Sequence, residues 1–474
     1  MEFNTILETK EKIISKKISI LELNEIFIKR IKENLNLNAF VFFNEELIIK
    51  RCKELDNNKD NLALKGIPLG IKDLFCTIGM TTTAGSKILS NFIPTYESFV
   101  TAKLLNQGSV FIGKTNLDEF AMGSSTTTSI FGNTINPKSL PGKKLVSGGS
   151  SGGSAAAVSA NLCLGATGTD TGGSIRQPAS FCGVVGIKPT YGLCSRWGII
   201  AFASSLDQAG IFANNVKDTS VLLKEIVGYD HNDSTSANVK IPNYFDNLNI
   251  DISGKTIGIP NEYNLPNIPD EISKVWDNAK KVLEKGGAII KNISLPHTKY
   301  ALPAYYIIAP AEASSNLARY DGVKYGFRAD SETSLDDMYE LTRSEGFGKE
   351  VKRRILIGTY VLSAGYYDAY YLKAQKVRKL ITDDFKNAFN ECDLILTPTT
   401  PSPAFPIGDK EDDPIKMYLN DIFTVPASLA GLPGISIPFG QSDKGLPLGV
   451  QLLSKHFDEQ TILDVGLYLE NNNE

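Results

Sequence analysis

The sequence predicts an α/β protein with a single large domain, in which helices cover both faces of a twisted, mixed β-sheet. Three observations lead to this prediction. The 474 residues are 42% hydrophobic, which is enough to bury a large core. Short apolar runs typical of strands occur towards both ends of the chain, and a charged, helical stretch lies between them. No internal repeat of solenoid length is present, so we expect distant segments to share one sheet.

The N-terminal part of the chain, residues 1–60, is predicted to be mainly helical. Ser19 and Glu22 have the spacing of a capping box, and apolar residues follow them at helical intervals. The apolar run from Ala39 to Phe43 is typical of a strand. We therefore expect a capped helix that leads into a short strand.

The rest of the chain alternates between strand-and-loop and helical character. From residue 64 to 215, Gly/Ser/Thr-rich turns separate short apolar runs, and these runs are Val110–Ile112, Cys163–Ala166 and Val184–Ile187. Residues 230–255 are polar and predict a surface connection. Residues 268–390 return to helical periodicity, and residues 394–453 again hold short strands. We interpret these segments as parts of one domain spanning residues 1–474.

Composition and charge exclude several classes of function. The net charge of -4 predicts no broad basic face, so we expect any nucleic acid to be bound mainly by another subunit. The six cysteines form no CxxC pair and no zinc-like cluster, which predicts reduced thiols and no metal site. No targeting segment is recognisable, and no apolar run reaches the roughly 18 residues of a membrane helix. We expect a cytoplasmic protein.

The first of two Gly/Ser loops spans Ser147 to Ser154. Its composition alone is that of a flexible linker. A phosphate-binding loop is disfavoured, because no Lys-Ser or Lys-Thr closes the loop. The loop runs directly into the Ala-rich, helical segment 155–158, and apolar strands lie on both sides. We therefore favour an ordered loop near a site.

The second loop, Thr169 to Arg176, places Ser174 directly after Gly172 and Gly173. Consecutive unhindered N–H groups can converge on one developing negative oxygen, as an oxyanion hole requires. The alternative is an ordinary tight turn, in which Ser174 caps the following helix.

A serine nucleophile needs a base, which can be a histidine or a neutral lysine. The three histidines are His231, His297 and His456, and none lies in a recognisable catalytic motif; a histidine base stays open, because triads assemble from distant positions. A neutral lysine can replace histidine if burial lowers its pKa. Lys72 ends an apolar run where burial is plausible, and Lys114 fits that description almost as well. Alternatively, Lys72 is an exposed residue paired with Asp73.

Three segments taken together resemble the amidase-signature family. They are residues 66–73 (GIPLGIKD), 148–158 (GGSSGGSAAAV) and 169–180 (TDTGGSIRQPAS), and residues 204–210 extend the match. The resemblance implies that Ser174 is the nucleophile, Ser150 the bridging serine and Lys72 the base.

The same resemblance implies the local geometry of the site. The peptide bond before Ser150 is expected to be cis, as in the family, and Ser151 is the neighbouring alternative for the bridging role. The N–H groups of the turn Thr171, Gly172, Gly173 and Ser174 are expected to hold the oxyanion.

Further segments resemble the glutaminase subunits of tRNA-dependent amidotransferases; these segments are residues 312–322, 342–348, 350–355 and 363–371. This resemblance implies that Arg354 binds the α-carboxylate of glutamine and Asp421 its α-ammonium group, with Tyr305 and Ser124 completing the pocket. An arginine suits the first task, because its planar fork bonds a carboxylate in a bidentate manner. Without the resemblance, Arg354 would be assigned to a solvated helix face and Asp421 to the surface.

The resemblance also implies partners. Ammonia would pass to a B subunit that carries the ATP and Mg²⁺ sites and most of the contact with Glu-tRNA(Gln). A small C subunit would complete a heterotrimer, and this chain would bind no cofactor. Two alternatives are a stand-alone amidase acting on another small amide and a catalytically inactive scaffold subunit.

Overall fold

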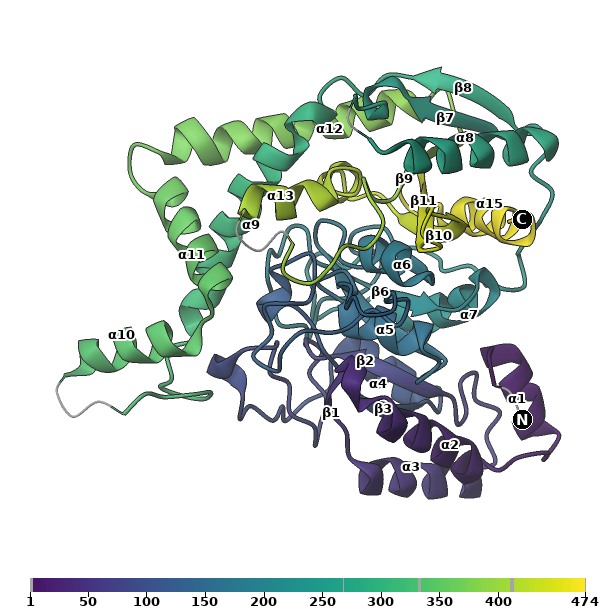
Figure 1. Cartoon of the computed structure of the whole chain (residues 1–474). Coiled ribbons are helices and arrows are strands. Elements are labelled where there is room, and N and C mark those ends of the chain that lie inside the picture. Colours follow the sequence, from purple (N-terminus) through teal and green to yellow (C-terminus); the bar gives the residue numbers. More distant parts are fainter. Residues whose placement is uncertain (1–2, 267, 331–333, 410–412, 474) are drawn as a thin grey trace.

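The computed structural model describes residues 3–266, 268–330, 334–409 and 413–473. Its centre is an eleven-stranded sheet with the order β1-β3-β2-β4-β6-β5-β10-β11-β9-β7-β8 (Figure 1). The strands are β1 Phe40–Phe42, β2 Pro68–Lys72, β3 Val110–Thr115, β4 Gly165–Asp170, β5 Val185–Lys188, β6 Gln208–Ala213, β7 Thr256–Pro260, β8 Ile289–Ile293, β9 Leu394–Pro398, β10 Gly434–Gln441 and β11 Pro447–Ser454. The sheet is mixed, since β2 runs parallel to β3 and β4 whereas β4 runs antiparallel to β6.

Helices flank this sheet, which confirms the predicted α/β fold. The helices are α1 Ile6–Ile14, α2 Ile20–Glu33, α3 Glu45–Asn57, α4 Phe99–Asn106, α5 Gly152–Ser159, α6 Arg176–Cys182, α7 Val216–Ile226, α8 Asp270–Lys285, α9 Ala301–Asn316, α10 Leu335–Gly346, α11 Lys349–Leu362, α12 Lys373–Ala388, α13 Pro414–Tyr418, α14 Val425–Leu429 and α15 Glu459–Asn471. None of the described helices is both long and apolar enough to cross a membrane.

Local sequence signals account for many of these elements. Ser19 and Glu22 form the predicted capping box at the start of α2, with each side chain accepting the backbone N–H of the other residue at 3.1 and 2.9 Å. Each apolar run of the sequence contributes to a strand, although β4 starts two residues after Cys163. Residues 230–255 contain neither helix nor strand and form a connection, as predicted, but Tyr244 and Ile252 within it are buried and not at the surface.

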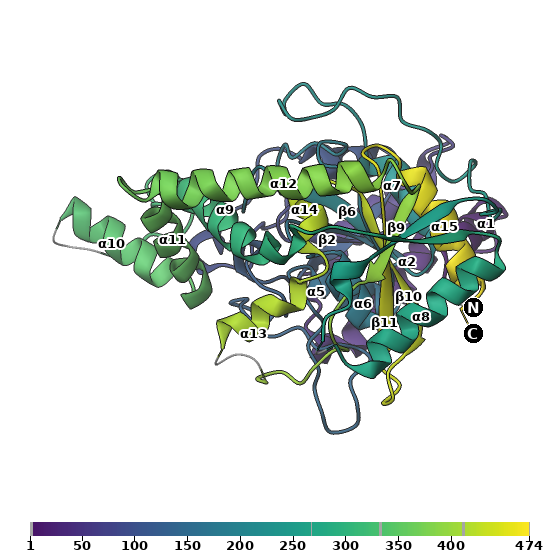
Figure 2. The ribbon, with the colours of Figure 1, turned by 90° about the horizontal axis from the view of Figure 1, so that it is seen from above.

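Four helices, α9 to α12, extend to one side of the sheet (left in Figures 1 and 2). Within this extension, α11 and α12 both pack against α9. Arg354 lies on α11 and Tyr305 on α9, so the extension carries two residues of the predicted glutamine pocket.

The other side of the site comes from the sheet. β2 and β4 are parallel neighbours, with Gly70 opposite Ala166, so their carboxyl ends lie side by side. Lys72 is the last residue of β2, and the second Gly/Ser loop begins within the end of β4. The sheet thereby places the candidate base next to the turn that carries Ser174.

Candidate active site

The amine of Lys72 is the centre of a buried cluster of hydroxyl groups. Its Nζ lies 2.9 Å from Ser150 Oγ, 2.8 Å from Ser151 Oγ and 2.7 Å from Thr169 Oγ1. The lysine side chain is completely buried, and no ion pair joins it to a carboxylate within the described residues. Ser174 is not among its partners, so Lys72 can exchange a proton with Ser174 only through an intermediate group.

Burial also changes the pKa of this lysine. Loss of hydration lowers the pKa of Lys72 to about 7, although the more distant carboxylates of Asp118, Asp170 and Asp207 oppose the shift. A substantial fraction of the amine is therefore neutral near neutral pH and able to accept a proton.

Lys114, the other candidate base, has a different environment. It is equally buried, but its Nζ lies 3.3 Å from a carboxylate oxygen of Asp73 and 2.8 Å from the carbonyl oxygen of Phe75. Asp73 therefore pairs with Lys114, and the alternative of an exposed Lys72 paired with Asp73 is wrong. The structure gives Lys114 a structural partner and leaves Lys72 beside the serines.

The first Gly/Ser loop is ordered and leads into α5. Its Gly149–Ser150 peptide bond is cis, as predicted. The Gln177 side chain accepts the Gly149 N–H at 3.0 Å, and the Ser150 carbonyl accepts the Asp118 N–H at 3.1 Å. The Asp118 carboxylate packs so tightly against Gly149 that a Cβ there would lie 2.1 Å from it. These contacts hold the Ser150 hydroxyl next to the amine of Lys72.

Ser150 and Ser151 differ in what their protons can do. The Ser151 hydroxyl donates to the Thr169 carbonyl oxygen at 3.2 Å, whereas no carbonyl or carboxylate acceptor is recorded for the Ser150 hydroxyl among the described residues. The proton of Ser150 is therefore available for a relay, which favours Ser150 over Ser151 as the bridging serine.

The second Gly/Ser loop turns sharply between β4 and α6. Asp170 forms a buried ion pair with Arg176 at 3.0 Å and accepts the Ile175 N–H at 3.2 Å, which ties the two ends of the turn together. Helix α6 begins after an N-cap at Ile175, so the alternative of Ser174 as a helix cap is wrong. Ser174 is 8% exposed at the open side of the turn.

The backbone of this turn is suited to hold an oxyanion. Gly172 and Gly173 are buried, and no acceptor is recorded for their N–H groups or that of Ser174 in the described parts of the chain. Gly173 has φ +151°, and a Cβ there would lie 2.2 Å from Thr424 Oγ1. Only glycine fits that position, so the turn keeps its donors directed at one point.

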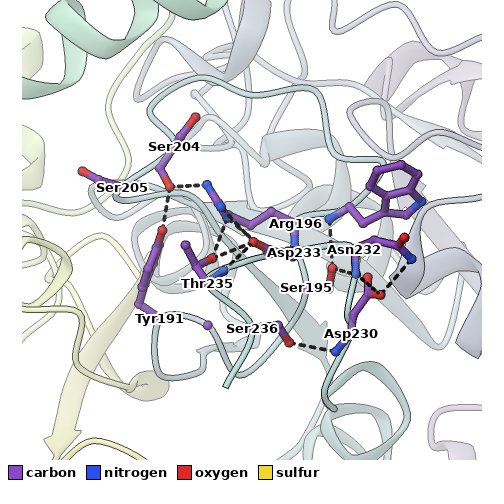
Figure 3. A network of polar contacts seen from close by, with 12 residues as sticks. Tyr191, Ser195, Arg196, Ser204, Ser205, Asp230, Asn232, Asp233, Thr235 and Ser236 are labelled. Carbon is purple, nitrogen blue, oxygen red and sulfur yellow. Dashed lines mark hydrogen bonds and ion pairs between the residues drawn. The ribbon is translucent and has the colours of Figure 1, made fainter. Parts of the chain in front are cut away.

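The segment Ser204–Asp207 supports the turn from behind. Asp207 accepts the Thr171 hydroxyl at 2.7 Å and the Phe202 N–H at 2.8 Å. Figure 3 shows how Arg196 holds this segment, with one Nη donating to the Ser204 carbonyl at 2.5 Å and the other pairing with Asp233 at 2.9 Å. The Arg196–Asp233 pair thus connects residues 230–236 to the oxyanion turn.

A cavity of about 370 Å³ has Ser124 and Arg354 in its wall, and Ser124 connects it to the serine turn through Asp421. Arg354 is 3% exposed and lies over the rings of Tyr306 and Tyr418 at 5.3 and 5.5 Å. Its Nε donates to Glu350 at 2.8 Å, and no partner is recorded for its two Nη groups within the described residues. These two groups can bind a carboxylate in the cavity, and the alternative of a solvated helix face is wrong because Arg354 is buried.

Asp421 lies between this cavity and the oxyanion turn. It accepts the Ser124 hydroxyl through Oδ2, while Oδ1 is buried with no hydrogen-bond partner among the described residues. Oδ1 lies 3.3 Å from the position that a Cβ on Gly173 would occupy. Burial raises the pKa of Asp421 to about 7. An unpaired buried carboxylate at this place suits a substrate ammonium group, and the alternative of a surface residue is wrong.

Tyr305 packs directly against the turn, since its hydroxyl would lie 2.9 Å from a Cβ on Gly172. The structure therefore gathers Ser124, Tyr305, Arg354 and Asp421 around the turn of Ser174. The histidines lie elsewhere: His297 bonds Asp384 at 2.9 Å, His456 contacts the Ala430 carbonyl at 3.0 Å, and the His231 side chain is 84% exposed.

Sequence reasoning assigned no role to several residues that shape the site. Thr169 contacts the amine of Lys72 and belongs to the second loop, so its position in the motif was a usable signal. Gln177 donates to the Ser124 carbonyl at 2.9 Å while holding Gly149, and Glu350 orients Arg354. Glu350 lies four residues before Arg354, so its helical spacing was also a usable signal. The backbone partners of Gln177 lie in other segments, so its place in the 169–180 motif was the only signal for it.

This arrangement has the parts of an acyl-transfer site. A hydroxyl nucleophile, a relay hydroxyl, a lysine with a lowered pKa and a turn with free N–H donors lie together, and a charged pocket lies beside them. Arg354 in the cavity wall has free donors, and Asp421, which lies between Ser124 and the turn, has an unpaired carboxylate oxygen, so the site suits a small zwitterionic amide.

Comparison with known proteins supports this interpretation. A family model described as Amidase matches residues 22–463. The A subunit of the glutamyl-tRNA(Gln) amidotransferase of Pelagibacter ubique is 58% identical over 467 residues, covering 98% of this chain and 96% of that protein. The corresponding A subunit of Parvibaculum lavamentivorans is 55% identical over 471 residues, with the same coverage of 98% and 96%.

Solved structures agree in fold. The crystal structure of the A subunit of glutamyl-tRNA(Gln) amidotransferase from Thermotoga maritima is 42% identical with a TM-score of 0.82, covering 99% of this chain and 94% of that one. The peptide amidase PAM, solved in complex with the competitive inhibitor chymostatin, is 29% identical with a TM-score of 0.84, covering 99% and 97%.

Proposed function

Because the chain belongs to the amidase family, we propose that its serine site hydrolyses glutamine as the A subunit of a glutamyl-tRNA(Gln) amidotransferase. The observation that carries this proposal is the pair of opposite charges beside the nucleophile turn. Arg354 offers a free guanidinium fork and Asp421 an unpaired carboxylate oxygen. A neutral aliphatic amide would need neither group, whereas glutamine carries both complementary charges.

In the proposed reaction, Ser174 Oγ attacks the side-chain carbonyl of glutamine. Its proton moves to Ser150, while Ser150 passes its own proton to the neutral amine of Lys72. The N–H groups of Gly173 and Ser174 stabilise the oxygen that becomes negative. The tetrahedral intermediate then collapses, the protonated Lys72 returns its proton through Ser150 to the leaving nitrogen, and ammonia departs.

The second half of the reaction repeats these steps with water. The acyl-enzyme holds the glutamyl group on Ser174 through an ester bond. Lys72 and Ser150 remove a proton from the attacking water, and the ester breaks to give glutamate and free Ser174. Arg354 and Asp421 hold the same substrate charges throughout, so the glutamyl group stays aligned with the turn.

Ammonia is consumed elsewhere in the proposed complex. A B subunit would activate Glu-tRNA(Gln) with ATP and Mg²⁺ and convert it to Gln-tRNA(Gln), and a small C subunit would complete the heterotrimer. A net charge of -4 agrees with leaving most of the RNA contact to a partner. Such a reaction belongs in the cytoplasm, where the six buried free cysteines would stay reduced.

The test is ammonia release from glutamine by the complex reconstituted with B and C subunits. We expect activity in the wild type and its loss in Ser174→Ala, with Ser159→Ala, a helix serine that bonds a carbonyl at 2.7 Å, as the control. Full activity of Ser174→Ala would refute the mechanism. Faster hydrolysis of a simple aliphatic amide than of glutamine would favour a stand-alone amidase instead.

A further inference from the structure

Glu119 is a buried carboxylate that the proposed reaction does not use. It is 1% exposed and lines the same cavity as Arg354. Both of its oxygens accept the Gly348 N–H, at 3.1 and 2.9 Å, and the Ser86 hydroxyl donates to it. A carboxylate is costly to bury, so its contacts indicate what it is retained for.

These contacts hold the start of α11. Gly348 is the N-cap of that helix, where free N–H groups and the helix dipole favour a negative charge. Arg354 lies on the same helix, and Glu350 on its first turn bonds Arg354. The position of the helix start therefore sets where the guanidinium fork lies in the glutamine pocket.

The residue before Glu119 holds the opposite side of the site. Asp118 accepts the N–H groups of Thr126 and Thr127 at 2.8 and 3.0 Å, and its carboxylate packs against Gly149. Its own N–H donates to the Ser150 carbonyl at 3.1 Å. Consecutive Cα atoms are about 3.8 Å apart, so one peptide bond joins the anchor of the serine loop to the anchor of α11.

We propose that Glu119 is a positioning residue that acts through Gly348 and α11 to hold Arg354 at a fixed distance from the serine turn. The proposal rests on the assignment of glutamine as substrate. It predicts that loss of the Glu119–Gly348 contact weakens recognition of the substrate carboxylate and leaves the chemistry of Ser174 intact.

The test compares Glu119→Met, which removes both acceptor oxygens at a similar side-chain length, with wild type in the reconstituted complex. We expect KM for glutamine to rise about tenfold while kcat stays within about threefold, because the reacting groups are unchanged. Labelling of Ser174 by a small sulfonyl fluoride, which carries no α-carboxylate, should proceed at the wild-type rate. Glu345→Met is the matched control, since Glu345 forms an exposed pair with Lys87 at 3.1 Å near the same helix junction.

A second variant covers the case in which Glu119→Met fails to fold. In Gly348→Ala the new Cβ would lie 2.3 Å from Glu119 Oε2, so it displaces the carboxylate without removing its charge. The same rise in KM with unchanged labelling supports the proposal. An unchanged KM, or labelling that falls in parallel with glutamine hydrolysis, overturns it. A wild-type complex that labels at Ser174 but releases no ammonia overturns the proposed function instead.

Discussion

Lys72 Nζ lies 2.9 Å from Ser150 Oγ, in a buried cluster that contains no carboxylate partner for the amine among the described residues. Its sequence neighbour Asp73 faces the other way and pairs with Lys114. Two buried lysines in adjacent strands therefore have opposite roles: Lys114 neutralises a buried acid, and Lys72 is available to carry a proton.

This contrast predicts opposite effects of removing the two amines. We expect Lys72→Met to lose at least about a thousandfold in kcat, because the base is gone. Its melting temperature should equal or exceed that of wild type. Burial lowers the pKa of Lys72 from 10.5 to about 7, so the unfolded chain binds more protons between these values and the lysine lowers stability below pH 10.5.

The control is Lys114→Met. It leaves Asp73 buried without its cation, which costs about 3 kcal/mol of unfolding free energy. Denaturant titrations of both variants at about pH 7 measure the difference. Equal destabilisation of the two variants would contradict the separate roles.

The fall of kcat/KM at low pH depends on two groups: the pKa of Lys72 is lowered and that of Asp421 is raised. Lys72 must be neutral and Asp421 ionised, and both have a pKa of about 7 in the folded protein. Protonation of either group as the pH falls removes the base or the ammonium ligand. We therefore expect kcat/KM for glutamine to fall steeply below about pH 7, with a limiting slope close to two.

Removal of one of these groups should change the slope. In Asp421→Asn the residue that binds the ammonium group no longer titrates. The fall of kcat/KM at low pH should then reflect the protonation of Lys72 alone, with a slope close to one, and KM should be higher. A profile that stays flat between about pH 5 and 8 in the wild type would show that Lys72 is not the base.

The third prediction concerns the two serine hydroxyls that contact the amine of Lys72. Ser151 already donates to the Thr169 carbonyl, whereas Ser150 is free to relay a proton. We expect Ser150→Ala to lower kcat by about two to four orders of magnitude, and Ser151→Ala by about tenfold or less. Single-turnover release of ammonia measures this step directly, and the reverse order of effects would assign the relay to Ser151.

Local signals in the sequence were sufficient for much of the fold. The capping box of Ser19 and Glu22 needs only three residues of separation, and the strands around the site are continuous apolar runs. Lys72 and Lys114 could not be separated in this way, because both end such runs. The difference lies in which lysine Asp73 meets across the sheet. Only the resemblance to the amidase-signature family selected Lys72, the lysine that lies beside Ser150 in the structure.

The residues of the substrate pocket were even harder to predict from local sequence patterns. Ser124 contacts Asp421, which is 297 residues away in the sequence. In the sequence, Arg354 belongs to a basic run typical of a surface, whereas in the structure it lies on the buried side of α11 over the ring of Tyr306. Glu119 gave no signal at all, and Gln177 gave none beyond its place in the 169–180 motif, since both contact backbone groups of distant segments. Such contacts depend on the path of the chain and not on a residue pattern.

The final prediction concerns the glycine that shapes the oxyanion turn. Gly173 has φ +151°, and an added methyl group would meet the Thr424 hydroxyl at 2.2 Å. Gly173→Ala must shift the turn and with it the N–H groups that face the substrate oxygen. We expect a loss of about two to three orders of magnitude in kcat, as for removal of an oxyanion donor, and about 1–3 kcal/mol of stability.

Gly79 provides the matched control for that strain. It also has a positive φ, +76°, but an added Cβ would meet nothing within 4 Å. Gly79→Ala should cost about 1 kcal/mol of unfolding free energy and leave kcat unchanged. Burst-phase kinetics of both variants locate the defect, because a displaced oxyanion turn slows acylation of Ser174 itself. If Gly173→Ala acylates at the wild-type rate, the turn is not the oxyanion hole.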